Sequence, residues 1–149
     1  MKKYKLGYTQ GTFDLFHVGH LNIINNAKAY CDYLVVGVND DELVKEYKNK
    51  IPNVNVENRV KIVNAIKGVD EVIIANTLDK MKMHELVQFD AIFIGDDWKG
   101  NERWKKTEED MKSIGVDVVY LPHTEGISTT LLSKKIKGVD YGQNKDTSN

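Results

Sequence analysis

The sequence predicts an α/β fold, in which a mostly parallel sheet of five strands is covered by helices on both faces. Two observations lead to this prediction. Apolar runs typical of strands alternate with segments of helical periodicity, and the connections between them are short. The chain has 149 residues, enough for one ordinary domain and too few for two full-sized ones. We expect one domain over residues 1–137 and a polar tail over residues 138–149.

The chain begins with a predicted strand and a predicted helix. Residues 5–9 are expected to form the first strand, which ends at Gln10-Gly11-Thr12. Residues 19–30 are expected to form the first helix. Apolar side chains recur there at helical spacing, at Leu21, Ile24 and Ala27.

A buried strand, a short helix and a loop are predicted next. Residues 33–38 form a nearly continuous apolar run, as in a strand that is buried on both faces. The polar residues 39–41 offer an N-cap for a short helix over residues 42–46. Residues 47–55 are basic, contain a proline and show no periodicity, so we expect a loop there.

The second half of the chain continues the alternation. Residues 56–67 place Val60, Val63 and Ile66 on one helical face. The remaining strands are predicted at residues 71–75, 91–95 and 116–121, and the remaining helices at residues 79–88, 104–115 and 129–137. This order of elements predicts a single Rossmann-like unit.

Composition excludes several classes of protein. The 21 Lys and Arg residues against 22 Asp and Glu residues give a net charge of -1, so there is no bulk basic field for nucleic acid. No apolar run approaches the roughly 18 residues that span a bilayer, and the basic N-terminus leads into a strand and not into a signal peptide. The single Cys31 excludes an intrachain disulfide and a Cys-rich zinc site. We therefore expect a cytoplasmic protein with no nucleic-acid or membrane partner.

The first candidate site is the segment Gly11-Thr12-Phe13-Asp14-Leu15-Phe16-His17-Val18-Gly19-His20, directly before a predicted helix. Free N–H groups and the helix dipole make such a helix start favourable for phosphate. His17 and His20 are three residues apart, so both rings can donate to the same phosphate group. Two alternatives remain open: the histidines are ordinary surface residues, or they are a pair of metal ligands with Asp14 as a third.

The segment Thr124–Thr130 precedes the last predicted helix. Gly126 permits a tight turn, and the hydroxyls and amides of Ser128, Thr129 and Thr130 can face phosphate oxygens. The alternative is that this Ser/Thr cluster only caps the helix.

Two further segments lie where the carboxyl ends of strands are predicted. Lys45, Lys48 and Lys50 follow the second strand, and can either neutralise phosphates or form a solvated loop. Asp96-Asp97-Trp98 follows the fourth strand. Either aspartate can serve as a helix cap, and Trp98 can pack in the core. Ligands in such folds bind beyond these strand ends, so both segments are candidates for a site.

Three motifs in order carry a resemblance to a known family. Gly11-Thr12-Phe13-Asp14 followed by His17-Val18-Gly19-His20 resembles the nucleotidyltransferase signature. With Gly95-Asp96-Asp97-Trp98 and Thr124–Thr130, the chain is similar to bacterial glycerol-3-phosphate cytidylyltransferases from about residue 4 to residue 137. Leu131 and Leu132 stand where adenylyltransferases carry a basic residue, which favours the cytidylyl branch.

The resemblance implies a reaction and its partners. CMP passes from CTP to sn-glycerol 3-phosphate by direct in-line attack, giving CDP-glycerol and pyrophosphate. Mg²⁺ is carried with the triphosphate, no metal is held by the protein alone, and the protein is a homodimer. CDP-glycerol serves teichoic acid or capsule synthesis. The alternatives are a cytidylyltransferase for another phosphorylated alcohol or polyol, and a CTP-binding module without turnover.

The resemblance also assigns residues. His17, His20, Lys48 and Lys50 are expected to be catalytic, and Lys48, Arg59 and Lys80 to bind the phosphorylated alcohol. Asp97 is expected to help to recognise cytosine. The complete expected set for CTP is Thr12, Phe13, Asp14, His17, Gly19, His20, Lys50, Asp97, His123, Thr124, Gly126, Ile127, Ser128, Thr129 and Thr130.

One residue departs from the family pattern. The last motif usually begins with arginine, where this chain has His123. Arginine is permanently charged, whereas histidine is only partly charged near neutral pH. We therefore expect altered CTP affinity or an altered pH dependence, with loss of turnover as the alternative.

Overall fold

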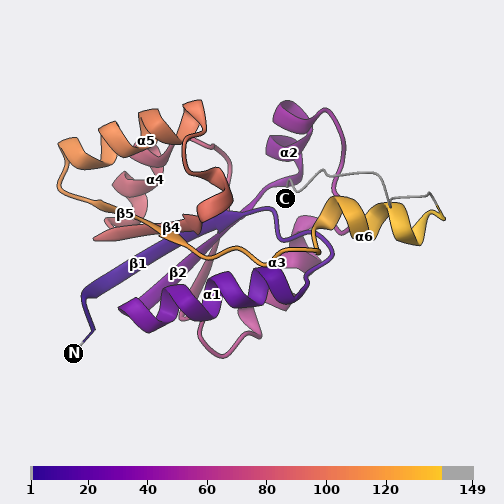
Figure 1. Cartoon of the computed structure of the whole chain (residues 1–149), viewed down its shortest axis with the longest axis horizontal. Helices are drawn as coiled ribbons and strands as arrows, with labels where there is room; N and C mark the ends of the chain where they lie inside the picture. Colours follow the sequence, from indigo (N-terminus) through magenta and orange to yellow (C-terminus); the bar gives the residue numbers. More distant parts are fainter. Residues whose placement is uncertain (1, 139–149) are drawn as a thin grey trace.

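The computed structural model describes residues 2–138 and shows five parallel strands in the order β3-β2-β1-β4-β5 (Figure 1). The predicted α/β class is confirmed, and the sheet is parallel throughout the described residues. The strands are β1 (Tyr4–Gly11), β2 (Cys31–Asn39), β3 (Glu71–Ala75), β4 (Ala91–Gly95) and β5 (Asp117–Leu121).

Helices cover both faces of this sheet. The α-helices are α1 (Val18–Tyr30), α2 (Asp41–Lys48), α3 (Val56–Asn64), α4 (Lys80–Val87), α5 (Glu102–Ser113) and α6 (Thr129–Ile136), with a short 3₁₀ helix at Asp96–Trp98. In Figure 1, α1 and α3 lie on one side of the sheet and α4 and α5 on the other, whereas α2 and α6 extend beyond its carboxyl edge.

Two apolar clusters form the core, one on each face. On the first face, Ile24 and Ala27 of α1 and Val63 of α3 pack with β2 residues such as Val36 and Val38. On the second face, Met83 of α4 and Met111 of α5 pack against the sheet. Because both faces are covered, the central strands are apolar on both sides, as the run in β2 predicted.

The strand order creates a switch point beside β1. The chain runs from β1 to β2 and β3 on one side, and then crosses to β4 and β5 on the other. Connections therefore leave the carboxyl ends of β1 and β4 in opposite directions, which opens a crevice between them. The loop into α1 follows β1 there, and the Asp96–Trp98 turn follows β4.

One predicted boundary was wrong in a way that affects the site. The short helix after β2 continues to Lys48, so Lys45 and Lys48 are helical and the expected loop begins at Asn49. Asn49 adopts the left-handed conformation, with φ of 56°, and its N–H donates to the carbonyl of Lys45. This cap ends the helix. Of the predicted tail, residues 139–149 lie outside the described residues.

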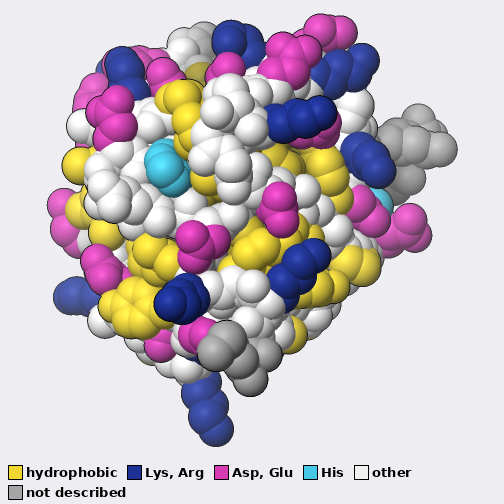
Figure 2. Space-filling view, turned by 90° about the vertical axis from the view of Figure 1, so that its left-hand side faces the viewer, with side chains coloured by type: hydrophobic (Ala, Val, Ile, Leu, Met, Phe, Trp, Pro, Cys, Tyr) yellow, Lys and Arg dark blue, Asp and Glu magenta, His cyan; other side chains and the backbone are white. Residues whose placement is uncertain are grey.

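The face at the amino ends of the strands carries both charged and apolar side chains (Figure 2). Acidic and basic side chains are intermixed there around apolar patches, and neither sign of charge dominates the view (Figure 2). No helix within residues 2–138 is long and apolar enough to cross a membrane.

Candidate active site

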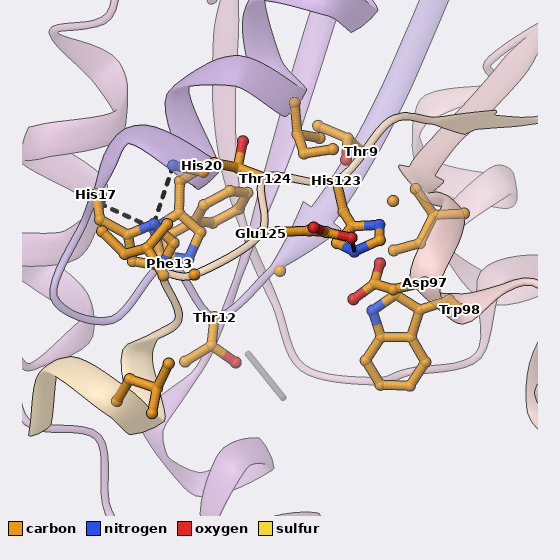
Figure 3. Close-up of a pocket in the computed structure, with 18 of the residues that line it drawn as sticks. Thr9, Thr12, Phe13, His17, His20, Asp97, Trp98, His123, Thr124 and Glu125 are labelled. Atoms are coloured by element: carbon orange, nitrogen blue, oxygen red, sulfur yellow. Dashed lines mark hydrogen bonds and ion pairs between the residues drawn. The ribbon is translucent and has the colours of Figure 1, made fainter. Parts of the chain in front are cut away.

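A cavity of about 390 Å³ opens at the switch point between β1 and β4. The loop into α1, the end of β4 and the loop before α6 form its wall (Figure 3). Ten residues that the sequence predicted for the nucleotide line this cavity: Thr12, Phe13, His17, Gly19, His20, Asp97, His123, Thr124, Gly126 and Ile127.

The two histidines close the amino end of α1. His17 is the N-cap, and its Nδ1 accepts the N–H of Gly19 at 3.0 Å. The Nδ1 of His20 accepts the N–H of His17 at 3.2 Å (Figure 3, dashed lines). A ring nitrogen that accepts an N–H carries no proton, so each neutral ring holds its proton on Nε2. The cap therefore makes both Nε2 atoms hydrogen-bond donors.

Burial keeps the His17 ring in this state. The desolvated ring has a pKa below its usual value, because burial disfavours the imidazolium. Its Nε2 is buried and has no hydrogen-bond partner among the described residues. The rings of His17 and His20 stack with centroids 3.8 Å apart, and both line the cavity. This pair is suited to donate hydrogen bonds to an anion.

Gly19 and the preceding loop hold the pair in position. A Cβ on Gly19 would lie 2.8 Å from Cε1 of His17, so the capping geometry requires glycine there. Phe13 and Leu15 adopt positive φ of 54° and 48°. Such backbone conformations cost free energy in non-glycine residues and concentrate at functional sites. The buried Phe13 ring in turn packs edge-on against His20, with centroids 5.3 Å apart.

The opposite end of the cavity is formed by Asp97, Trp98 and His123 (Figure 3). Nδ1 of His123 lies 2.5 Å from Oδ1 of Asp96. This hydrogen bond is the main reason why the pKa of His123 is raised and that of Asp96 is lowered. The imidazolium form of His123 is thus favoured at this end.

Metal ligation was an open alternative for the two motif histidines. Asp14, the expected third ligand, instead accepts the N–H groups of Asn53 and Val54 at 2.7 and 2.9 Å. Across residues 2–138, the one His/Asp/Glu group close enough to share an ion is Asp96, Asp97 and His123, whose ligand atoms lie within 4.8 Å of one another. Since Asp96 is already paired with His123, we assign no metal centre.

A second cavity, of about 500 Å³, adjoins the first on the side of α2, α4 and α5. The two share residues at the end of β1, including Thr12, and also Trp98. Lys48, Lys50 and Lys80, three lysines that the sequence singled out, line the second cavity. Lys48 and Lys80, predicted for the phosphorylated alcohol, thus lie in the second cavity together with Lys50, which was predicted for CTP, whereas Arg59 lines neither of the two cavities.

Lys80 is the buried cation of the second cavity. It is 7% exposed, and its Nζ donates to the carbonyl of Leu78 at 2.8 Å. Burial lowers its pKa to about 7, and the nearby Arg103 contributes to this effect. Its charge is therefore sensitive to pH and to any anion that enters.

A smaller cavity of about 130 Å³ connects the lysines to the start of α6. It is lined by Lys48, Lys50, Asp14, Thr129 and Thr130, among others. The hydroxyl of Thr129 donates to the carbonyl of Asp14 at 2.6 Å, which ties the α6 start to the histidine loop. The amino ends of α1 and α6 thus approach the same region, as expected for two helix starts that serve one anion.

Three predicted ligand-binding residues have structural partners instead. The buried Asp14 carboxylate anchors the loop at Asn53 and Val54, and Ser128 is a buried N-cap that accepts the N–H of Leu131. Arg59 is 1% exposed, and its guanidinium donates to protein oxygens. The predicted contact of the Arg59 side chain with substrate stays a prediction, and in this structure the guanidinium is buried among its protein acceptors. A buried arginine that organises a site has the same appearance in a sequence as one that binds a ligand.

Several cavity residues were missed from the sequence. Gln10, the next-to-last residue of β1, and Asn39, the last residue of β2, both line the second cavity, and Gln10 Nε2 donates to Asn39 Oδ1 at 2.9 Å. Arg103 lines the second cavity from the first turn of α5. For Gln10 and Asn39, the available signal was the rule that ligands bind at carboxyl strand ends, because these two residues stand next to the end of β1 and at the end of β2.

Comparison with known proteins now decides the family. The model of the family described as cytidylyltransferase-like matches residues 8–135, which include both connected cavities. The chain belongs to this cytidylyltransferase-like family.

Individual family relatives cover most of the chain. The glycerol-3-phosphate cytidylyltransferase of Bacillus subtilis is 38% identical over 132 residues, which is 88% of this chain and 96% of that protein. The ethanolamine-phosphate cytidylyltransferase of Dictyostelium discoideum is 36% identical over 89% of this chain and 38% of that protein. A solved structure of a lipopolysaccharide core biosynthesis protein from Thermoplasma volcanium has a TM-score of 0.70 and 28% identity, with 82% of this chain and 99% of that chain covered.

Proposed function

We propose that this protein transfers CMP from CTP to sn-glycerol 3-phosphate and releases CDP-glycerol and pyrophosphate. The observation that supports this most strongly is the pair of connected cavities, one with the histidine donors and the other with the lysines. Glycerol-3-phosphate cytidylyltransferases that match over most of their length supply the substrates of the proposal.

CTP occupies the first cavity in this proposal. Its cytosine lies at the end with Asp97, Trp98 and His123, where a carboxylate or carbonyl oxygen can accept from the cytosine amino group. Its phosphates lie beside His17 and His20 and at the starts of α1 and α6. The two Nε2–H donors then face the phosphates.

The acceptor enters from the second cavity. One oxygen of its phosphate attacks the α-phosphorus of CTP in line, the bond from that phosphorus to the bridging oxygen breaks, and pyrophosphate leaves with the electron pair. Lys48 and Lys50 offset the repulsion between the two anions. The histidine donors stabilise the negative charge that grows on the transferring and leaving phosphates.

Mg²⁺ accompanies the triphosphate in this proposal. Magnesium prefers oxygen ligands and retains several waters, so phosphate oxygens supply the ligands that the protein does not. The donor set fits this arrangement: the Asp14 carboxylate accepts from Asn53 and Val54, the histidines line the first cavity, and Lys48 and Lys50 line the small cavity beside it. The ion's contribution is to neutralise charge on the triphosphate.

Pyrophosphate release tests the proposed reaction. We would incubate the protein with Mg²⁺, with either CTP or ATP, and with a panel of phosphorylated alcohols. We expect release with CTP and glycerol 3-phosphate and little with ATP. Pyrophosphate release with CTP and a different phosphorylated alcohol would support the same reaction mechanism but identify another acceptor. No release under any combination would favour a CTP-binding module, the alternative motivated by His123.

Lys80 gives the acceptor step a pH dependence. Its pKa of about 7 means that it loses its charge as the pH rises through that value. Since the charged form attracts an anionic acceptor, kcat/KM for the acceptor should fall above pH 7, by up to about tenfold per pH unit. The Lys80→Arg variant keeps its charge and should lose this fall, while all other titrating groups stay the same. Equal pH profiles for the two proteins would contradict the role of Lys80.

His123→Arg tests the residue that departs from the family pattern. Arginine keeps the positive charge beside Asp96 at all pH values, whereas His123 loses it above its raised pKa. KM for CTP should therefore be nearly unchanged at acidic pH and about two- to fivefold lower than that of the wild type at alkaline pH. Loss of CTP use in the variant at every pH would show that this end of the cavity serves another purpose.

Three further features belong to the same proposal. The protein acts as a homodimer in the cytoplasm, and its product serves teichoic acid or capsule synthesis. Analytical ultracentrifugation tests the dimer, and a monomer at working concentration would contradict it.

A further inference from the structure

The second cavity has an unusual distribution of charge around its aromatic side chains. Tyr47, Trp98 and Trp104 are the aromatic residues that line it. A cation lies near each ring: the Lys48 Nζ is 5.7 Å from the Tyr47 centroid, the Arg103 Cζ 5.3 Å from Trp98, and the Lys80 Nζ 5.5 Å from Trp104. Aromatic faces that could attract an ammonium group are therefore already paired with the protein's own cations.

Carboxylates are missing from the same wall. The described residues that line the cavity include four cations, Lys48, Lys50, Lys80 and Arg103, and no Asp or Glu. Asp79 is the acidic residue that influences Lys80, but its Oδ1 accepts the N–H of Met81 at the start of α4. Neither Lys80 nor Arg103 forms an ion pair with a carboxylate within residues 2–138. A positively charged ligand would find no counter-charge there.

The four cations occupy two sides of the cavity. Lys48 and Lys50 also line the small cavity that reaches the start of α6, so they belong to its phosphate side. Lys80 and Arg103 come from α4 and α5. Lys80 is buried, whereas Arg103 is exposed at the rim, and they are close enough for Arg103 to depress the Lys80 pKa. An acceptor whose phosphate lies at Lys48 and Lys50 thus extends its other end towards Lys80 and Arg103.

We propose that Arg103, with Lys80 beneath it, is a specificity-determining residue that admits acceptors with an uncharged, oxygen-rich end and rejects those that end in an ammonium group. The inference rests on the proposed cytidylyl transfer and defines its acceptor class. Hydroxyl oxygens of a polyol can accept from the lysine and guanidinium donors. An ammonium group would lose its hydration beside like charges, and such juxtaposition weakens binding.

Two acceptors that differ at the end away from the phosphate provide the test. Glycerol 3-phosphate ends in hydroxyl groups and ethanolamine phosphate in an ammonium. We would measure kcat and KM for both with CTP, using the wild type, Arg103→Gln and Arg103→Glu. Lys105→Gln is the matched control, because it removes a cation from the same helix at an exposed position outside the cavity.

The wild type and Lys105→Gln should prefer glycerol 3-phosphate by at least about a hundredfold in kcat/KM. Arg103→Gln should reduce this ratio by about tenfold through KM for the acceptors, and Arg103→Glu should reduce it further. KM for CTP should not change. Equal ratios in all four proteins, or a change confined to KM for CTP, would overturn the role of Arg103.

Failure of the proposed cytidylyl transfer can be distinguished from failure of the proposed role of Arg103. If the wild type transfers CMP to neither acceptor, that function fails. Acceptor selectivity is then measured by calorimetric binding of glycerol 3-phosphate and of ethanolamine phosphate to the CTP-bound protein. Tighter binding of glycerol 3-phosphate that weakens in Arg103→Glu supports the inference, and equal binding of the two overturns it.

Discussion

His17→Ala is expected to lower kcat by about a hundred- to a thousandfold, the loss typical when a preorganised transition-state donor is removed. The Nε2 of His17 is buried in the cavity wall, and the α1 cap keeps its proton on that atom. The substitution also removes the side chain that accepts the Gly19 N–H. We therefore expect a loss of about 1 kcal/mol in the free energy of unfolding.

His17→Asn separates these two effects. Asparagine is a preferred N-cap, and its side-chain oxygen can accept the N–H of Gly19, but it cannot place an N–H donor where Nε2 lies. We expect a stability close to that of the wild type and the same large loss of kcat. Steady-state kinetics and urea unfolding measure the two quantities. A variant with near-normal kcat would show that His17 only caps the helix.

The largest effect on stability is expected from Arg59→Met. Arg59 is 1% exposed and donates to the carbonyls of Thr12, Asn39 and Val54 at 2.7–2.8 Å, and to Asp41 at 2.5 Å. It joins the ends of β1 and β2 to α2 and to the loop before α3. The substitution removes the donor to these oxygens, which should lower the free energy of unfolding by about 3–5 kcal/mol.

Lys61→Met is the matched control for this change. Lys61 is an exposed cation on the same helix, and its loss should change the free energy of unfolding by less than about 0.5 kcal/mol. We expect Arg59→Met to lower Tm by roughly 10 °C, measured by circular dichroism, with little change in the control. If Arg59→Met is as stable as the wild type but has a raised KM for the acceptor, this result would contradict the structural role of Arg59. It would instead support the direct contact with the substrate that the sequence predicted.

The strands and the histidine motif could be predicted because each is a local pattern. The bounds of β3 and β4 match the strands predicted at residues 71–75 and 91–95, where apolar side chains follow one another along the chain. His17 and His20 lie on the wall of the cavity because the loop after β1 leads into the start of α1 at the carboxyl edge of the sheet. Both inferences needed only neighbouring residues and the rule for carboxyl strand ends.

The partners of Asp14 and Arg59 and the position of Arg103 could not be predicted, because they depend on contacts between segments that are distant in the sequence. Asp14 bonds to Asn53 across 39 positions, and Arg59 to the carbonyl of Thr12 across 47. No local pattern separates such a bond from a ligand contact. Arg103 follows the Asp96–Trp98 turn at the start of a charged helix, where its sequence resembles that of a solvated surface. Its place in the second cavity emerges only when α5 packs beside α4.

Transfer with isotopically labelled acceptor tests the central claim most directly. Glycerol 3-phosphate that carries ¹⁸O in its phosphate would be incubated with CTP and Mg²⁺, and the products followed by ³¹P NMR. Direct attack predicts CDP-glycerol and pyrophosphate in equal amounts, with label in the oxygen that bridges the two phosphates of CDP-glycerol and none in pyrophosphate. Absence of CDP-glycerol, or label in the released pyrophosphate, would contradict the account.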